Sequence, residues 1–96
     1  MAEPRGNVAG AHQEHQVKFY GLSTCIWCRK TRQFLEDENV AFDFVYVDLL
    51  EGDEREAVKD EIREWNPRVS FPTIVIDGAQ CVIGFKTDEL KQVLGL

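Results

Sequence analysis

Two cysteines separated by two residues, Cys25 and Cys28, carry the clearest chemical signal in this sequence. Such a pair at the start of a helix can close a disulfide and reopen it, because one helical turn brings the two sulfurs within bonding reach. A helix start also offers unpaired N–H groups and the positive end of the helix dipole, and both stabilise a thiolate. The pair follows an apolar, strand-like run at 17–20 and precedes an amphipathic helical pattern. In that context the Cys-x-x-Cys spacing predicts a redox-active dithiol.

The two cysteines are expected to play different roles. Thiols at helix starts have pKa values of roughly 3.5–7.5 in place of about 8.5, and Cys25 is therefore the expected nucleophile. Cys28 lies one turn deeper on the apolar stripe of the helix, so we expect it to be shielded and to act second. In the predicted cycle Cys25 attacks a substrate disulfide, and Cys28 then attacks the mixed disulfide at Cys25 and releases the reduced substrate.

The charges on the same helix are arranged against the helix dipole. Its first half carries cations and its last turn carries anions, namely Arg29, Lys30, Arg32, Glu36, Asp37 and Glu38. Each such charge costs about 0.3–1 kcal/mol near a helix end. Positive charge beside Cys25 favours its thiolate, which gives the pattern a functional interpretation. The alternative is a solvated helix face whose charges are screened.

Length and composition limit the classes of protein that the chain can represent. With 96 residues it forms one domain, and its formal net charge of −6 argues against nucleic acid as a partner. No apolar run approaches the roughly 20 residues that span a bilayer, so no membrane partner is expected. Residues 1–16 lack the apolar core of a signal peptide, and three cysteines are an odd number for a disulfide-stapled secreted domain. These features predict a cytoplasmic monomer.

The order of hydrophobic patterns predicts an α/β domain over residues 16–96, preceded by a flexible N-terminal tail at 1–15. The elements follow the order β-α-β-α-β-β-α, with strands at 16–21, 40–48, 71–77 and 80–83 and helices at 25–38, 53–65 and from 87. The first two strands are expected to be parallel and the last two antiparallel, in a four-stranded mixed sheet flanked by helices. Asp53 and Glu56 match the spacing of a capping box, and Thr87 is a candidate cap for the last helix.

Three segments resemble, in chain order, the motifs of the glutaredoxin family. The run at 20–28, Tyr-Gly-Leu-Ser-Thr-Cys-Ile-Trp-Cys, is similar to the active-site stretch of that family. Residues 70–76 resemble its Thr-Val-Pro strand, whose proline is cis, and residues 84–88 are similar to its Gly-Gly-x-Thr/Ser-Asp segment. The resemblance covers about residues 16–96. It implies a three-layer, thioredoxin-like fold and a thiol-disulfide oxidoreductase that reduces protein disulfides or glutathione mixed disulfides.

The resemblance also implies which residues bind substrate or glutathione. Phe71, beside the expected cis Pro72, would pair its backbone with the substrate as a short antiparallel strand. Thr87 and Asp88 would hold the γ-glutamyl end of glutathione. Trp27 would pack against a substrate peptide or shield the second cysteine, with an ordinary surface aromatic as the alternative. Asp88 alternatively complements the dipole of its own helix.

Departures from the family pattern bear on the electron donor. Leu22 stands where many glutaredoxins carry a lysine that meets a glutathione carboxylate, and Phe85 replaces the second glycine of the late motif. Ile26 replaces the usual proline, and Arg68 lies one residue from the common place of a glutathione-binding basic residue. These changes resemble the glutaredoxin-like redoxins that accept electrons from thioredoxin reductase and reduce ribonucleotide reductase. Glutathione and thioredoxin reductase are therefore both candidate electron donors, and glutathione is favoured.

Two other functions could use the same cysteine pair. A lone Cys-x-x-Cys supplies two of the four ligands of a zinc site, so a metal site would need Cys81 or a histidine in addition. Alternatively two chains and external thiols share an iron–sulfur cluster, as in some glutaredoxins. A third possibility is a redox-sensing adaptor that changes partner affinity without turnover. We expect no metal and interpret Cys81 as a small buried hydrophobe.

Overall fold

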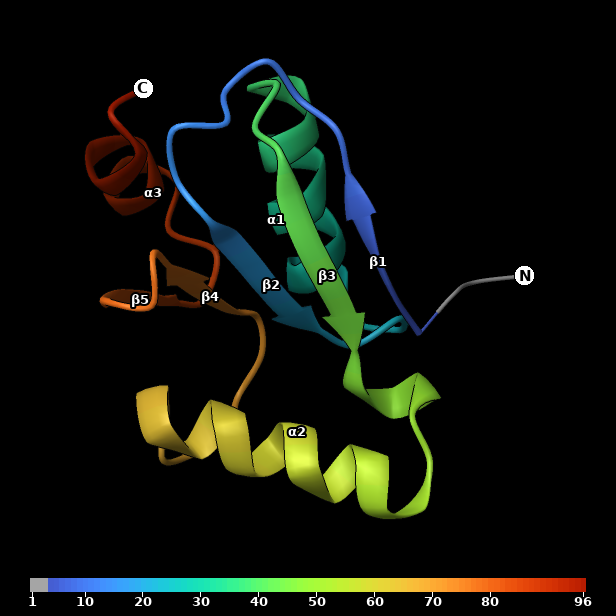
Figure 1. The fold of residues 1–96 in the computed structure, drawn as a ribbon. Helices are drawn as coiled ribbons and strands as arrows, with labels where there is room; N and C mark the ends of the chain where they lie inside the picture. Colours follow the sequence, from blue (N-terminus) through green and yellow to red (C-terminus); the bar gives the residue numbers. More distant parts are fainter. Residues whose placement is uncertain (1–3) are drawn as a thin grey trace.

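The computed structural model describes residues 4–96, and within that range it shows one five-stranded mixed sheet with three α-helices around it (Figure 1). The sheet has the strand order β1-β3-β2-β4-β5. Its strands are β1 (Arg5–Val8), β2 (Val17–Gly21), β3 (Phe42–Tyr46), β4 (Thr73–Ile76) and β5 (Gln80–Ile83). The helices are α1 (Ile26–Asp37), a short 3-10 turn η1 (Val47–Leu49), α2 (Gly52–Trp65) and α3 (Thr87–Leu94).

The pairing of the strands confirms the predicted topology. β2 and β3 are parallel and are connected through α1, whereas β2 pairs antiparallel with β4, and β4 pairs antiparallel with β5. From β2 onward the order is β-α-β-α-β-β-α, as in thioredoxin-like folds. Because β2 and β3 run in the same direction, the loop after β2 and the turn after β3 lie next to each other, at the end of the sheet where both strands terminate.

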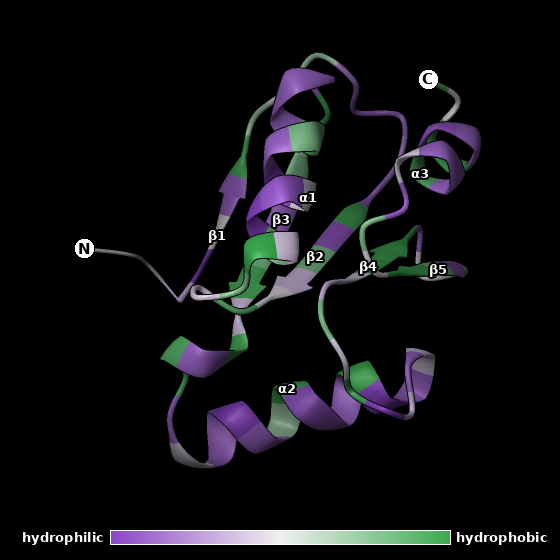
Figure 2. Cartoon of the chain, turned by 180° about the vertical axis from the view of Figure 1, so that it is seen from behind, coloured by the Kyte–Doolittle hydropathy of each residue, from purple (hydrophilic) through white to green (hydrophobic). Residues whose placement is uncertain are grey.

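Two hydrophobic layers lie on opposite faces of the sheet, because successive strand residues point to opposite sides. Phe19 and Ile74 belong to the layer that includes residues of α1 and α3, and both are fully buried. Tyr20 and Val75, their chain neighbours, belong to the layer that includes residues of α2. Figure 2 shows β4 as hydrophobic along its length and most of α2 as hydrophilic. The sheet is therefore the middle of three layers.

The sheet has five strands where the sequence predicted four, and the additional strand comes from the N-terminal segment. β1 pairs antiparallel with β3 at the edge of the sheet. Its own residues are mostly exposed, so hydrophobic periodicity could not reveal it. Most of the segment 1–15, which the sequence predicted to be a tail, thus packs against the domain. Residues 1–3 lie outside the described range. The flexibility of 1–15 and the boundary at residue 16 stay predictions.

The beginnings of two helices differ from the sequence-based expectation. α2 begins at Gly52 with Glu51 as its N-cap, and no side chain caps it. The capping box predicted from Asp53 and Glu56 is therefore wrong, and Asp53 lies in the first turn, where its charge favours the dipole. Thr87 is likewise the first helical residue of α3 and not its cap. In the described part of the chain, no helix combines the length and apolar content that crossing a membrane requires.

The segment after β1 lies tightly against the turn before β3. The His12 N–H donates to the Asn39 carbonyl at 3.0 Å, and the Ala41 N–H donates to the His12 carbonyl at 3.0 Å. Gly10 lies so close to this turn that a Cβ on it would be 2.6 Å from backbone atoms of Val40 and Ala41. Backbone atoms cannot rotate away as a flexible side chain could, so this contact requires glycine.

We therefore predict that Gly10→Ala lowers the free energy of unfolding by about 1–3 kcal/mol, because the turn or the N-terminal segment must shift. Urea denaturation measures the change, and Ala9→Ser, at an exposed neighbouring position, is the matched control. Equal stability of the two variants would mean that residues 1–15 behave as a free tail in solution.

Candidate active site

Cys25 and Cys28 meet at the beginning of α1. Cys25 is the N-cap residue, with extended backbone, and its sulfur accepts a hydrogen bond from the Cys28 N–H at 3.2 Å. Cys25 is half-buried, whereas Cys28 is 1% exposed, and both are free thiols. The structure thus places one sulfur at a helix start and within reach of solvent, and the other one turn deeper, as the sequence predicted.

The environment of Cys28 keeps this thiol neutral. Burial, together with the hydrogen bond to Cys25, raises the pKa of Cys28 to about 12. The Leu22 N–H lies 3.5 Å from the Cys28 sulfur and partly offsets this shift. Because only the thiolate attacks disulfides, Cys28 is a poor first nucleophile at neutral pH. The two cysteines are therefore chemically inequivalent.

Asp48 positions the loop that leads into the cysteine pair. It follows β3 in the turn η1, and its carboxylate accepts hydrogen bonds from the Ser23 N–H at 2.8 Å and from the Ser23 hydroxyl at 2.5 Å. Sequence analysis missed both residues. The available signal was that the loop after β2 and the turn after β3 must meet if the two strands are parallel. Asp48 thus ties the segment before Cys25 to the sheet.

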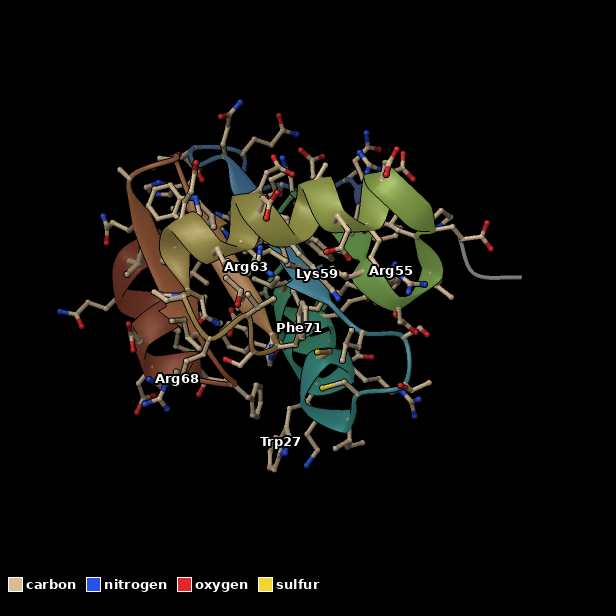
Figure 3. The ribbon with its side chains drawn as sticks, turned by 90° about the horizontal axis from the view of Figure 1, so that it is seen from below. Trp27, Arg55, Lys59, Arg63, Arg68 and Phe71 are labelled. Atoms are coloured by element: carbon tan, nitrogen blue, oxygen red, sulfur yellow. The ribbon has the colours of Figure 1, made fainter. Side chains whose placement is uncertain are left out.

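Trp27, Phe71 and Pro72, three of the predicted binding residues, line one cavity of about 340 Å³. Gly84 and Phe85 complete its lining. Trp27 is 53% exposed, and its ring centroid lies 6.0 Å from that of Phe85. Figure 3 shows Phe71 between α2 and Trp27. The cavity is mainly aromatic, and it can accept an apolar side chain beside Trp27, the residue between the two cysteines.

The loop before β4 is held by buried polar contacts. The Phe71–Pro72 peptide bond is cis, as expected, and the Gly84 N–H donates to the Pro72 carbonyl at 2.9 Å. Asn66 is 2% exposed, and its side-chain amide donates to the Thr73 hydroxyl at 3.0 Å and to the Ser70 hydroxyl at 2.9 Å. Sequence analysis treated Asn66 only as the end of a helix. In the structure it fixes the segment that carries Phe71.

Two predicted glutathione-binding residues, Thr87 and Asp88, lie outside the aromatic cavity. Thr87 and Asp88 begin α3, half-buried and exposed respectively, and neither lines the aromatic cavity. Their roles in holding glutathione stay predictions. Among residues 4–96 there is no group of three or more His, Cys, Asp and Glu side chains that could hold a metal ion. Cys81 lies half-buried in β5, where burial raises the pKa of its thiol.

Two of the cations expected beside Cys25 have other partners. The guanidinium of Arg32 lies 4.5 Å from the Phe44 ring centroid and donates to the Tyr46 hydroxyl at 2.7 Å. It therefore packs on β3. The Lys30 ammonium lies 4.9 Å from the Trp27 ring centroid, so its charge stays near the aromatic cavity. Arg29 is exposed.

The comparison with protein families decides the classification. The model of the Glutaredoxin family matches residues 17–80, from β2 to the first residue of β5 and including both cysteines of the pair. The chain belongs to the glutaredoxin family. This confirms the predicted family. The matched residues include the motifs at 20–28 and 70–76, whereas the motif at 84–88 lies beyond them. Membership makes the chain one of a family of thiol-disulfide oxidoreductases with the thioredoxin fold.

Relatives of this glutaredoxin-family chain cover nearly all of it. A glutaredoxin from Methanosarcina mazei Go1 is 46% identical, with a TM-score of 0.91, over 98% of this chain and 90% of that one. The methanoredoxin of Methanosarcina acetivorans is 37% identical, also with a TM-score of 0.91, over 95% and 96% of the two chains. A glutaredoxin-like 8.6 kDa protein of the rubredoxin operon in Clostridium pasteurianum is 33% identical over 78 residues, 81% of this chain and 96% of that protein. These likenesses are consistent with the glutaredoxin-like redoxin branch.

The raised pKa of Cys28 predicts how its alkylation depends on pH. A Cys25→Ser variant keeps the burial that contributes most to the raised pKa of Cys28 and loses the contribution of Cys25. The thiolate fraction of Cys28 in this variant should therefore go on rising beyond about pH 10. Iodoacetamide labelling followed by mass spectrometry of the Cys28 peptide measures this rise. The same peptide in the urea-unfolded chain is the control, and its rate should level off near pH 10, about one unit above the ordinary pKa of a thiol. A plateau at the same pH in the folded chain would contradict the shielded environment.

Loss of the Asp48 carboxylate should loosen the loop before Cys25. Asp48→Ala removes both acceptors of Ser23, so we predict a loss of about 1–3 kcal/mol in the free energy of unfolding. Asp48→Asn, which retains one acceptor oxygen, should lose less. Asp43→Ala, at an exposed position of β3, is the control for removing an acidic charge. Urea denaturation that ranks Asp43→Ala as the most damaging of the three would refute this role.

Proposed function

We propose that the chain is a dithiol oxidoreductase that reduces protein disulfides or glutathione mixed disulfides through Cys25 and Cys28. The observation that carries this proposal is the contact between the two thiols at the helix start. The half-buried Cys25 sulfur accepts the Cys28 N–H at 3.2 Å, and the Cys28 sulfur is shielded behind it. This arrangement offers one accessible sulfur to attack a substrate and a second sulfur, one turn away, to resolve the mixed disulfide.

The proposed cycle moves two electrons. The Cys25 thiolate attacks one sulfur of the substrate disulfide, a Cys25–substrate disulfide forms, and the other substrate sulfur leaves as a thiolate and takes a proton. Cys28 then loses its proton and attacks the Cys25 sulfur. The Cys25–Cys28 disulfide forms, and the second substrate thiol is released. Substrate is thereby reduced to two thiols while the pair is oxidised to a disulfide.

Glutathione is the proposed reductant of the oxidised pair, and thioredoxin reductase is the second candidate. Membership of the glutaredoxin family supports glutathione. Leu22 and Phe85 support the second candidate, since both are apolar where family members that bind glutathione carry lysine and glycine. The cytoplasmic location, the monomeric state and the absence of a nucleic-acid partner stay predictions from composition.

Substitution of each cysteine tests the cycle. Cys25→Ser should reduce turnover of a protein disulfide to the rate of uncatalysed exchange, because the attacking sulfur is lost. Cys28→Ser should retain only reactions that run through a glutathione mixed disulfide, because its resolving thiol is absent. Cys81→Ser should behave as the parent chain. Reduction of a protein disulfide by Cys25→Ser at the parental rate would overturn the proposal.

The electron donor is identified by comparing two coupled assays that follow NADPH oxidation. One contains glutathione and glutathione reductase, and the other contains thioredoxin reductase. Faster turnover in the first assay supports glutathione, whereas turnover only in the second assigns the chain to reductase-coupled redoxins. Absence of turnover in both, with a reducible substrate present, would count against a catalytic role.

A further inference from the structure

A cavity of about 630 Å³ lies on the α2 side of Phe71 and is lined by four cations, Arg55, Lys59, Arg63 and Arg68. These four residues define the basic groove. They are four of the 11 lysines and arginines in a chain whose formal net charge is −6. Random placement on an acidic surface would disperse them, so this concentration of positive charge requires an explanation of its own.

Three of these cations form a row. Arg55, Lys59 and Arg63 follow one another at intervals of four residues along α2, which corresponds to about 6 Å per interval. Figure 3 shows the three side chains in line on the side of α2 that faces Phe71, with Arg68 on the loop beyond the end of the helix. The groove is therefore a linear array and not a point site.

The charges of the array are largely available to a ligand. Within residues 4–96, neither Arg55 nor Arg68 has a salt bridge to a carboxylate, and the Arg55 Nε donates to the Leu50 carbonyl at 2.8 Å, which orients the guanidinium. Lys59 and Arg63 pair only with exposed carboxylates of their own helix. Exposed pairs of this kind are weak and exchange easily.

The groove and the aromatic cavity meet at Phe71. Phe71 lines both this cavity and the aromatic cavity of Trp27, so a substrate seated at Phe71 touches both. Leu22, whose N–H points to the Cys28 sulfur, lies in the lining of the groove as well. A substrate at Phe71 and Leu22, next to the cysteine pair, therefore has an aromatic cavity on one hand and, on the other, a groove that carries four cations and one carboxylate, Asp48.

We propose that the basic groove recognises an acidic, extended segment that flanks the disulfide of a protein substrate, with carboxylates at alternate positions. This inference rests on the proposed function. Alternate residues of an extended chain lie about 6.6 Å apart on one face, close to the interval between the cations of α2. Adjacent carboxylates would point to opposite faces, so the spacing selects a Glu-x-Glu-x-Glu pattern over a compact cluster.

The rest of the surface argues against a longer polyanion. α2 carries Asp53, Glu54, Glu56, Asp60, Glu61 and Glu64 in addition to its cations. A nucleic acid that followed the array beyond the cavity would meet these carboxylates and a net negative chain. A short peptide segment, in contrast, fits a cavity of about 630 Å³ and ends where the positive charge ends.

The test compares two disulfide peptides that are identical except for three glutamates at alternate positions beside the cysteine, replaced by glutamines in the second peptide. For the parent chain, kcat/KM at about 20 mM salt should be roughly 5- to 20-fold higher with the acidic peptide. The ratio should fall toward one at about 300 mM salt, because exposed charges are screened.

Two double variants with the same change of net charge locate the effect. Lys59→Gln with Arg63→Gln should lower the ratio to about 2 or less, whereas Lys18→Gln with Lys91→Gln, outside the groove, should keep the parental ratio. Thermal unfolding of both variants verifies that they fold. Because the ratio is measured within each variant, a general loss of activity does not change it.

Four other results would overturn the inference or the proposed function on which it rests. Equal kcat/KM for the two peptides with the parent chain, or an equal loss of preference in both double variants, overturns the inference. Inhibition by a short oligonucleotide at concentrations at which the acidic peptide does not compete would assign the groove to phosphate groups and also overturn it. A parent chain that cannot reduce bis(2-hydroxyethyl) disulfide, which carries no charge, refutes the proposed function itself.

Discussion

The hydrogen bond from the Cys28 N–H to the Cys25 sulfur is the contact on which the site depends. It makes a thiol the N-cap of α1, so the group that satisfies a free N–H at the helix start is also the predicted nucleophile. Packing of α1 then determines the second position, because Cys28, Thr31 and Leu35 are buried against the sheet. One helical turn is therefore enough to leave the Cys25 sulfur accessible and to bury the Cys28 sulfur.

Much of this arrangement was predictable because it is encoded locally. The Cys-x-x-Cys spacing, the apolar run before it and the amphipathic pattern after it define β2, α1 and the order of the thiols within the single stretch 17–37. The hairpin of β4 and β5 is likewise a short-range signal, and Gln80–Ile83 is observed with the predicted bounds. β3 is buried at Phe42, Phe44 and Val45 and exposed at Asp43, which agrees with a strand that is apolar on both faces except at Asp43.

Most of the features that the sequence did not reveal depend on contacts between distant segments, whereas Asn66 bonds to residues only four and seven positions away. Asp48 bonds to Ser23 across 25 positions, and β1 pairs with β3 across about 40. The basic groove combines the inward row of a helix with a loop residue, Arg68, whereas the sequence pattern of α2 indicates an acidic, solvated helix. The caps of α2 and α3 failed for a different reason: the side chains suited to capping lie one or two residues inside the helix.

The edge position of β1 has a consequence for the behaviour of the folded chain in concentrated solution. An uncovered β3 would present a row of unpaired N–H and C=O groups beside the Phe44 ring, and such a row is a template for strand addition from a neighbouring molecule. β1 occupies that row with its own backbone, and its Gly6 leaves room for the ring, which a Cβ would approach to 3.0 Å. Residues 5–8 thereby remove the β3 edge as a place for strand addition, and the edge of the sheet becomes β1, a strand of only four residues that are mostly exposed.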